Sequence, residues 1–235
     1  MSAPALALSF FDPGRDLYGQ ARTGLTLVFE GNEARALSEP AKLEAVEGGW
    51  RASLEPHVDL AFEPLSPPID LGIASTRLCR VSGKMSPHPI NGLGVAAETG
   101  EPPEWSELES LRTVCALFDP EHALLISGRL PREAEGHDAE LVVAALIDGG
   151  EPIAVDDALI STTYDRDGRQ LSCGVELHIE GAEFPRRAFG TAIAGTSIEL
   201  EGLDFQSAAF RWRMEGREGV GSYERASRPE PPAAA

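Results

Sequence analysis

Three side chains in this sequence have types and a spacing that could bind a metal ion. Glu176, His178 and Glu180 alternate along one segment, so a strand there would present all three on one face. A zinc site normally draws ligands from several segments, and no second pair of histidines accompanies this one. The same spacing is typical of the charged outer face of an amphipathic strand. We therefore predict a solvated strand face and no metal.

A second segment has the spacing of a nucleotide-binding turn. Gly92, Gly94 and Ala97 superficially match the fingerprint that brings a dinucleotide to a helix N-terminus. The segment continues into Glu98 to Pro103, which is not helical in pattern, and it belongs to no strand-helix-strand unit. We therefore predict no nucleotide cofactor. The sequence also lacks a Gly-x-Ser-x-Gly elbow, a His-Glu-x-x-His pair and a phosphate loop.

The elements that would position any site are strands. Hydrophobic and polar residues alternate with period two, as in Val175 to Glu180 and in Phe210 to Met214, and Gly-containing turns separate such runs. Two segments rich in Ala, Leu and Glu, at 105–117 and 140–147, are compatible with helix as well. Because hairpins surround them, we predict strands there, and an all-β, antiparallel fold.

Charge and composition exclude several classes of function. Twenty Lys and Arg against 38 Asp and Glu give a formal net charge of −18, which disfavours binding to nucleic acid or anionic membranes. No apolar run approaches the ~18 residues that span a bilayer, so we expect no transmembrane segment. The cysteines form no Cys-x-x-Cys pair and lie among apolar residues, so we expect reduced core thiols and a cytoplasmic location: Cys79, Cys115 and Cys173.

The chain also repeats itself. A shift of 107 residues superposes Phe11-Asp12-Pro13 on Phe118-Asp119-Pro120, then Leu17 on Leu124 and Arg22 on Arg129. We therefore expect two similar β units, at residues 1–110 and 111–227, followed by a disordered tail at 228–235. This frame predicts that the two Phe-Asp-Pro triplets occupy equivalent places.

Several segments resemble the hydroxyneurosporene synthase-like group, which includes carotenoid hydratases and AttH-like proteins. The resemblance covers most of residues 79–226, and the closing Gly-Val-Gly-x-Tyr-Glu strand is its most specific part. The segments are Cys79 to Gly83, Gly92 to Gly94, Trp105, Ser127 to Pro131, Thr162 to Asp165, Asp167 to Arg169, and Trp212 to Glu224.

The resemblance implies two lipocalin-like β-barrel units side by side and an apolar pocket for an isoprenoid, lipid or polyketide-like ligand. The first unit looks short for this group, so its barrel is expected to be incomplete. Residues of the resembling segments are the candidate ligand-binding groups: Trp105, Arg129, Trp212 and Tyr223. Tryptophans in such strands are equally well explained as core residues.

One departure from the group concerns catalysis. Relatives follow the Gly-x-Gly turn with Arg or His and a Trp-Gly pair, whereas here only Glu98 remains ionisable in the segment 95–100. Hydration, isomerisation or cyclisation would need an acid near the pocket, and the candidates are Glu98, Glu224 and His137. The His137 imidazole is the best histidine candidate for a barrel mouth.

The sequence thus predicts that the protein binds an apolar small molecule, with or without non-redox chemistry and without a cofactor. The alternative is a structural or interaction protein with side-chain-filled barrels and an acidic surface. Small residues in the second half favour room for a ligand there: Ala144, Ala145, Ala192, Ala194, Ala208 and Ala209.

Overall fold

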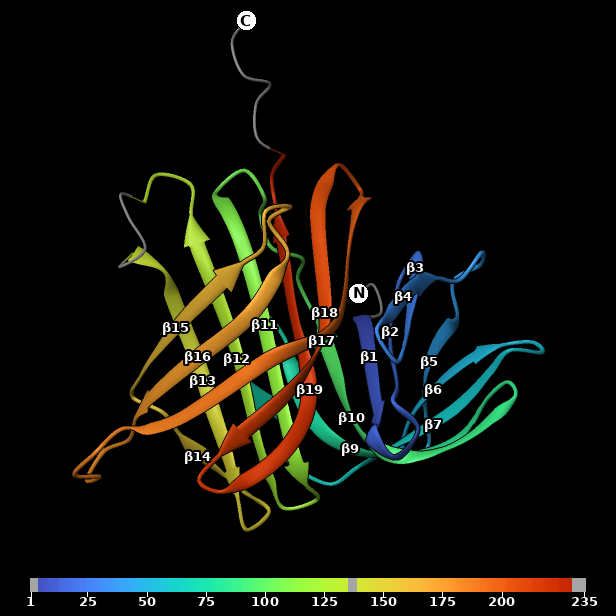
Figure 1. The fold of residues 1–235 in the computed structure, drawn as a ribbon, viewed down its shortest axis with the longest axis horizontal. Coiled ribbons are helices and arrows are strands. Elements are labelled where there is room, and N and C mark those ends of the chain that lie inside the picture. The colour runs from blue at the N-terminus through green and yellow to red at the C-terminus, as the bar shows by residue number, and fades with distance from the viewer. Residues whose placement is uncertain (1–3, 135–138, 230–235) are drawn as a thin grey trace, which may run out of the picture.

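A computed structural model describes residues 4–134 and 139–229 of the chain. Two large antiparallel sheets follow one another along the sequence and lie side by side (Figure 1). The described residues contain one helical element, the short 3-10 turn at Pro13–Arg15. The fold is therefore all-β, as the alternating pattern predicts.

The first sheet contains ten strands in the described residues and is drawn in blue to green in Figure 1. Its hydrogen-bonded order is β4-β3-β2-β1-β10-β9-β7-β6-β5, with β8 paired to β9. The strands are β1 (Ala5–Asp12), β2 (Leu17–Arg22), β3 (Leu25–Glu30), β4 (Glu33–Ala36), β5 (Lys42–Val46), β6 (Gly49–Leu54), β7 (Val58–Pro64), β8 (Ile69–Asp70), β9 (Ser75–Met85) and β10 (His88–Thr99).

The second sheet has nine strands in the part of the chain that the structure describes, in the order β14-β13-β12-β11-β19-β18-β17-β16-β15. The segments 105–117 and 140–147, for which helix was the competing interpretation, contribute β11 and β13. The strands are β11 (Leu108–Asp119), β12 (His122–Pro131), β13 (Leu141–Asp148), β14 (Glu151–Ala154), β15 (Asp157–Tyr164), β16 (Gln170–His178), β17 (Arg186–Leu200), β18 (Leu203–Met214) and β19 (Arg217–Ser227).

The two sheets have the same topology. In each, the first strand pairs with the second strand on one side and with the last strand on the other, as β1 does with β2 and β10, and β11 with β12 and β19. Phe11-Asp12-Pro13 ends β1 and Phe118-Asp119-Pro120 ends β11. The predicted equivalence of the triplets is confirmed. The main path of each sheet has nine strands, and the expectation that the first barrel is incomplete stays a prediction.

The Gly-x-Gly pairs lie where the last strand of each sheet pairs with the first strand. A side chain on Gly92 or Gly94 would overlap the backbone carbonyl of Phe11 or Ser9, and Gly219 and Gly221 meet β11 in the same way. The motif at 92–97 is therefore part of strand β10 and serves close packing of backbones.

Three clusters of buried apolar side chains hold the molecule together. One fills the inner face of the first sheet, including Phe10, Trp50 and Phe62. A second fills the inner face of the second sheet, including Phe210 and Trp212. The third lies between the sheets and joins outward-facing residues of both, such as Phe11, Leu27, Leu78, Leu117, Leu125 and Phe205.

Alternation of strand faces is clearest in β18. Trp212 is fully buried beside Phe210 and Met214, whereas Arg211 and Arg213 are exposed on the opposite face. The predicted orientation of this strand is confirmed. The cysteines are also buried and unpaired, and burial raises the pKa of the Cys79 and Cys173 thiols to about 12.

Among the described residues, no helix has the length and apolar character needed to cross a membrane. Of the predicted tail, Arg228 donates hydrogen bonds to the carbonyl oxygens of Trp105 and Leu108. Residues 230–235 lie outside the described residues.

Candidate functional site: a cavity between the sheets

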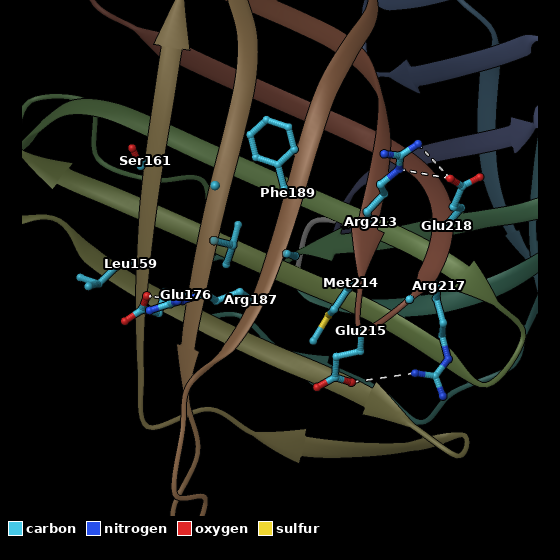
Figure 2. Close-up of a pocket in the computed structure, with 14 residues that line it drawn as sticks. Leu159, Ser161, Glu176, Arg187, Phe189, Arg213, Met214, Glu215, Arg217 and Glu218 are labelled. Atoms are coloured by element: carbon cyan, nitrogen blue, oxygen red, sulfur yellow. Dashed lines mark hydrogen bonds and ion pairs between the residues drawn. The ribbon is translucent and has the colours of Figure 1, made fainter.

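One hollow, of about 910 Å³, lies on the outer face of β15 to β19 and is open to solvent. Figure 2 shows its charged side chains pairing with one another: Arg187 lies 2.8 Å from Glu176 and Arg213 lies 3.0 Å from Glu218. The apolar side chain of Phe189 remains 53% exposed. This hollow is too open to surround a ligand, and the charged side chains shown in it are already paired with one another. It is therefore a poor candidate for a binding site.

A smaller cavity, of about 180 Å³, is less open to solvent and lies where the two sheets meet. Its walls come from β1, β2, β9 and β10 of the first sheet and from β11, β12 and β19 of the second. The apolar lining includes Ile73, Val95, Leu111 and Leu125, and the loop between β8 and β9 adds Leu71 and Ala74. Polar side chains from both sheets converge on the same space.

Strand alternation explains why polar groups reach this cavity. In β2, Leu17 and Ala21 face the interior of the first sheet, so Gln20 and Arg22 face the second sheet. In β19, Tyr223 faces the interior of its own sheet, so Ser222 and Glu224 face the first. The cavity is therefore built from the outer faces of both units.

An ion pair between the two sheets forms the charged centre of this cavity. The guanidinium of Arg22 pairs with the carboxylate of Glu224, and Thr113 Oγ1 donates a hydrogen bond of 3.2 Å to Glu224 Oε2. The Arg22 guanidinium also lies 4.3 Å from the ring centroid of Phe205. Contacts to Phe205 of β18 and Glu224 of β19 therefore hold this arginine of β2 in place.

Two further polar side chains in the lining lack complete hydrogen bonding. Gln20 Oε1 accepts a hydrogen bond from Ser207, but Gln20 Nε2 has no partner, and neither does Ser127 Oγ. The two residues are only 6% and 1% exposed, respectively. Buried polar atoms in proteins are almost always satisfied by protein, water or ligand, so these atoms mark a place where a polar ligand group or water belongs.

The thiol in the cavity is not suited to nucleophilic chemistry. Burial raises the pKa of Cys115 to about 11, in spite of the 3.2 Å contact between its sulfur and Ser222 Oγ. The thiolate, which is the reactive form, is therefore scarce near neutral pH. What the cavity offers chemically is an apolar enclosure, a guanidinium, a carboxylate and hydrogen-bonding groups.

Of the acids proposed from the sequence, Glu224 lines the cavity and Glu98 does not. Glu98 lies near the end of β10, where it accepts a 3.1 Å hydrogen bond from Trp50 Nε1 and lies 3.9 Å from the guanidinium of Arg77. It faces the inner side of the first sheet together with Trp50. His137 lies outside the described residues.

The predicted ligand-binding residues are dispersed. Trp212 and Tyr223 pack on Phe210 inside the second sheet, with ring centroids 5.5 and 5.8 Å from it. Arg129 is half-buried on β12 next to Gly72, close to the cavity but not in its lining. Trp105 lies in the loop before β11, where its carbonyl accepts hydrogen bonds from Arg228.

Sequence reasoning did not identify Gln20, Arg22 or Ser127. Ser127 follows an apolar run, 123–126, and that conflict is a usable signal for a buried polar site. Gln20 and Arg22 stand among small and polar residues, which give no such signal. Within residues 4–134 and 139–229, no group of three or more His, Cys, Asp or Glu side chains is placed to hold a metal ion.

Comparisons with known proteins show the fold. No family model and no curated protein matches the sequence. Among solved structures, the chain is similar to a protein described as an AttH candidate from Nitrosomonas europaea, with a TM-score of 0.63, 12% identity, and coverage of 95% of this chain and 92% of that one.

A second similar structure is kievitone hydratase from Nectria haematococca, with a TM-score of 0.56, 10% identity, and coverage of 96% of this chain and 89% of that one. Both likenesses extend over nearly the whole of each chain, so the paired arrangement of the two β units is shared. At these identities the comparison shows the architecture and assigns no chemistry to individual residues.

Proposed function

We propose that this protein binds an apolar small molecule in the cavity between the two sheets. The observation that carries the proposal is the cavity of about 180 Å³ in which apolar walls surround the Arg22–Glu224 pair and two unpartnered polar atoms. Binding sites of small molecules are typically apolar hollows with a few converging polar groups. The resemblance to AttH-like proteins, and the hydratase with the same architecture, support this class of function.

The volume limits what enters. A dry cavity of about 150 Å³ accommodates one benzene ring, so this cavity holds a single ring or a short branched chain. A longer isoprenoid, lipid or polyketide-like ligand would insert one end and leave the rest outside. Gln20 Nε2 would donate a hydrogen bond to an oxygen on the inserted end, and Ser127 Oγ would donate or accept one.

The finer proposal is non-redox chemistry of the hydration type, with Glu224 as the acid–base group. Its carboxylate is the acid candidate that lines the cavity, and Arg22 and Thr113 fix its orientation. Addition of water to a carbon–carbon double bond needs a proton donor on one side and an oriented water molecule on the other. Ser127 would hold the water, and the Glu224 carboxylate would take a proton from it as the water oxygen adds to one carbon. Glu224 would then return that proton to the other carbon, so that the double bond is replaced by one C–O and one C–H bond.

The alternative, a structural protein with side-chain-filled barrels, is favoured by one observation. Both inner faces are packed with large side chains such as Phe62 and Trp212, and the remaining space inside the first sheet is only about 10 Å³. Under this alternative, the cavity between the sheets holds water alone.

Mass spectrometry of material extracted from the native protein tests the binding proposal. A Ser127→Leu variant places an apolar side chain in the cavity, and Ala61→Leu makes a comparable enlargement on the exposed face of β7. We expect a co-purifying hydrophobic compound in the wild type and in Ala61→Leu but not in Ser127→Leu. Equal amounts in all three proteins, or none in the wild type, would refute the proposed function.

Glu224→Gln separates binding from chemistry. If Glu224 acts as the acid–base group, the variant retains the compound identified by extraction but does not add water to it. If the compound stays unchanged even with wild-type protein, the protein is a binder and the hydration proposal is wrong.

A further inference from the structure

A second hollow, of about 350 Å³, lies at the open end of the second sheet and is separate from the cavity between the sheets. Its lining includes Ser110 and Arg112 of β11, Leu130 of β12, Tyr164 of β15 and Arg225 of β19. None of these residues lines the cavity described above. The hollow combines an apolar wall, a tyrosine ring and two arginines.

One of these arginines is already neutralised. Arg112 makes a two-point ion pair with Glu140, and the side chains are only 13% and 8% exposed. The backbone leaves room for this pair, because a Cβ atom on Gly128 would lie 2.6 Å from Glu140 Oε1. Arg112 also donates a 3.1 Å hydrogen bond to Tyr223 Oη, which lies 2.9 Å from Thr162 Oγ1.

The other arginine, Arg225, is not neutralised by a carboxylate among the described residues. Arg225 lies directly opposite Arg112 in the pairing of β11 with β19. Like charges at opposed positions of neighbouring strands destabilise a sheet. Among the residues that the structure describes, Arg225 forms no ion pair, so two arginines share one carboxylate, and the lining has an excess of one positive charge in a protein of net charge −18.

Two buried amides next to these lining residues also lack partners. Gln206 lies opposite Arg225 and is 9% exposed, and its Oε1 accepts no hydrogen bond. Gln170 lies opposite Tyr164 and is 3% exposed, and its Nε2 donates none. Unsatisfied polar groups at this depth indicate that something polar belongs beside them.

We propose that this mouth is a binding site for a small aromatic carboxylate. The carboxylate pairs with the Arg225 guanidinium, which offers parallel N–H donors suited to two carboxylate oxygens. The aromatic ring lies along Leu130 and Tyr164, and Gln170 and Gln206 complete the polar contacts directly or through water. The ligand supplies a negative charge for Arg225, because the carboxylate of Glu140 is already paired with Arg112.

Calorimetric titration of the full chain with sodium benzoate and with benzamide tests this site, because benzamide has the same ring without the charge. We expect benzoate to bind at least about tenfold more tightly than benzamide, as for a charge-assisted hydrogen bond. Arg225→Gln should remove that preference, and Arg225→Lys should keep part of it. Arg213→Gln, on the exposed outer face of β18, should leave the preference for benzoate unchanged.

A second measurement maps the site and does not depend on affinity. In an NMR titration, benzoate should shift the side-chain signals of Arg225 and Gln170 and leave those of Gln20 unchanged. Equal binding of benzoate and benzamide, an unaltered preference in Arg225→Gln, an absence of saturable benzoate binding, or shifts centred on Gln20 would each overturn the proposal.

Folding of the variant supplies its own check. Arg225→Gln relieves the repulsion with Arg112, so its midpoint of thermal unfolding at low salt should equal or exceed that of the wild type. A marked loss of stability would show that Arg225 has a structural partner. The inference that the lining carries one uncompensated positive charge would then be wrong.

Discussion

The two sheets share a strand order but end in different charged clusters. In the first, Glu98 and Arg77 are both 28% exposed and lie beside Trp50 near the end of β10. In the second, Arg112 and Glu140 lie deeper, a glycine at position 128 leaves room for the pair, and Arg112 also donates a hydrogen bond to the hydroxyl of Tyr223. A deep ion pair loses more of its hydration than a shallow one. It therefore needs neighbouring groups that leave room for it and hydrogen-bond to it.

The interiors and the junction also differ. Large side chains fill most of both inner faces, and the polar cavity lies where the outer faces meet. A lipocalin-like unit is expected to hold its ligand inside the barrel. Here the duplication of the unit has created a second kind of space, between the two sheets, in addition to the hollow at the open end of the second sheet.

The largest effect is expected from the packed interior of the second sheet. Trp212→Ala should lower the free energy of unfolding by about 3 to 5 kcal/mol, because it leaves a large hole beside Phe210. Arg211→Ala, one residue away on the exposed face, should cost about 0.5 kcal/mol or less. Urea denaturation measures both. Equal shifts of the midpoint would mean that the inner face is loosely packed.

The contrast between the deep and the shallow ion pair predicts the next largest effect. Glu140→Gln leaves the buried Arg112 without its counter-ion and should cost about 3 kcal/mol. Glu98→Gln at the shallow cluster should cost about 1 kcal/mol or less. A double variant, Arg112→Met with Glu140→Leu, should recover most of the loss. If the two Glu→Gln variants unfold at the same urea concentration, depth does not distinguish the clusters.

Gly128 gives an intermediate effect through the same deep pair. Gly128→Ala forces a methyl group against Glu140 Oε1 and should cost about 1 to 3 kcal/mol as an overpacked site. Gly174→Ala on β16 is the matched control, because a Cβ atom there meets nothing within 4 Å. Thermal unfolding measures both, and a neutral Gly128→Ala would show that the pair can move aside.

The smallest effect concerns a third, half-buried cluster at the opposite end of the second sheet. A hydrogen bond from Arg186 holds the pKa of Asp148 below its usual value, and His122 and Arg217 contribute by charge. The stabilisation is therefore present above the unfolded-state pKa, about 3.9, and is lost as the pH falls through the lower folded-state value.

Asp148→Asn should accordingly be less stable than wild type at pH 7 by about 1 kcal/mol or less, and equally stable near pH 2. Asp204→Asn, on an exposed position of β18, is the control and should show no such pH dependence. Urea unfolding at the two pH values gives the comparison. A difference that persists unchanged at pH 2 would exclude the ion pair as its cause.

Local pattern predicted the fold because the period of two is a property of each strand by itself. Alternation in Phe210 to Met214 assigned the faces of β18 correctly, and the 107-residue frame located β1 against β11 and β2 against β12. The frame fails further along because the second unit has longer strands and connections. Its β13 begins at Leu141, although Leu25 of β3 shifted by the same amount would fall at 132.

The site was harder to predict because its groups belong to different sheets. Arg22 and Glu224 are separated by 202 residues, and the spacing of residues within either strand does not indicate that the two side chains pair. The alanines that suggested space inside the second barrel divide between two surfaces. Ala144 and Ala208 face its filled interior, whereas Ala145, Ala194 and Ala209 face the first sheet.

The pairing of first with last strands also sets an order of events during synthesis. β1 finds its partner β10 only when the chain has been made as far as Thr99, and β11 must wait for β19 to be completed at Ser227. Each sheet therefore closes late, through contacts that are distant in sequence, which slow folding. A cavity that needs Arg22 from one sheet and Glu224 from the other can form only after synthesis has passed Glu224.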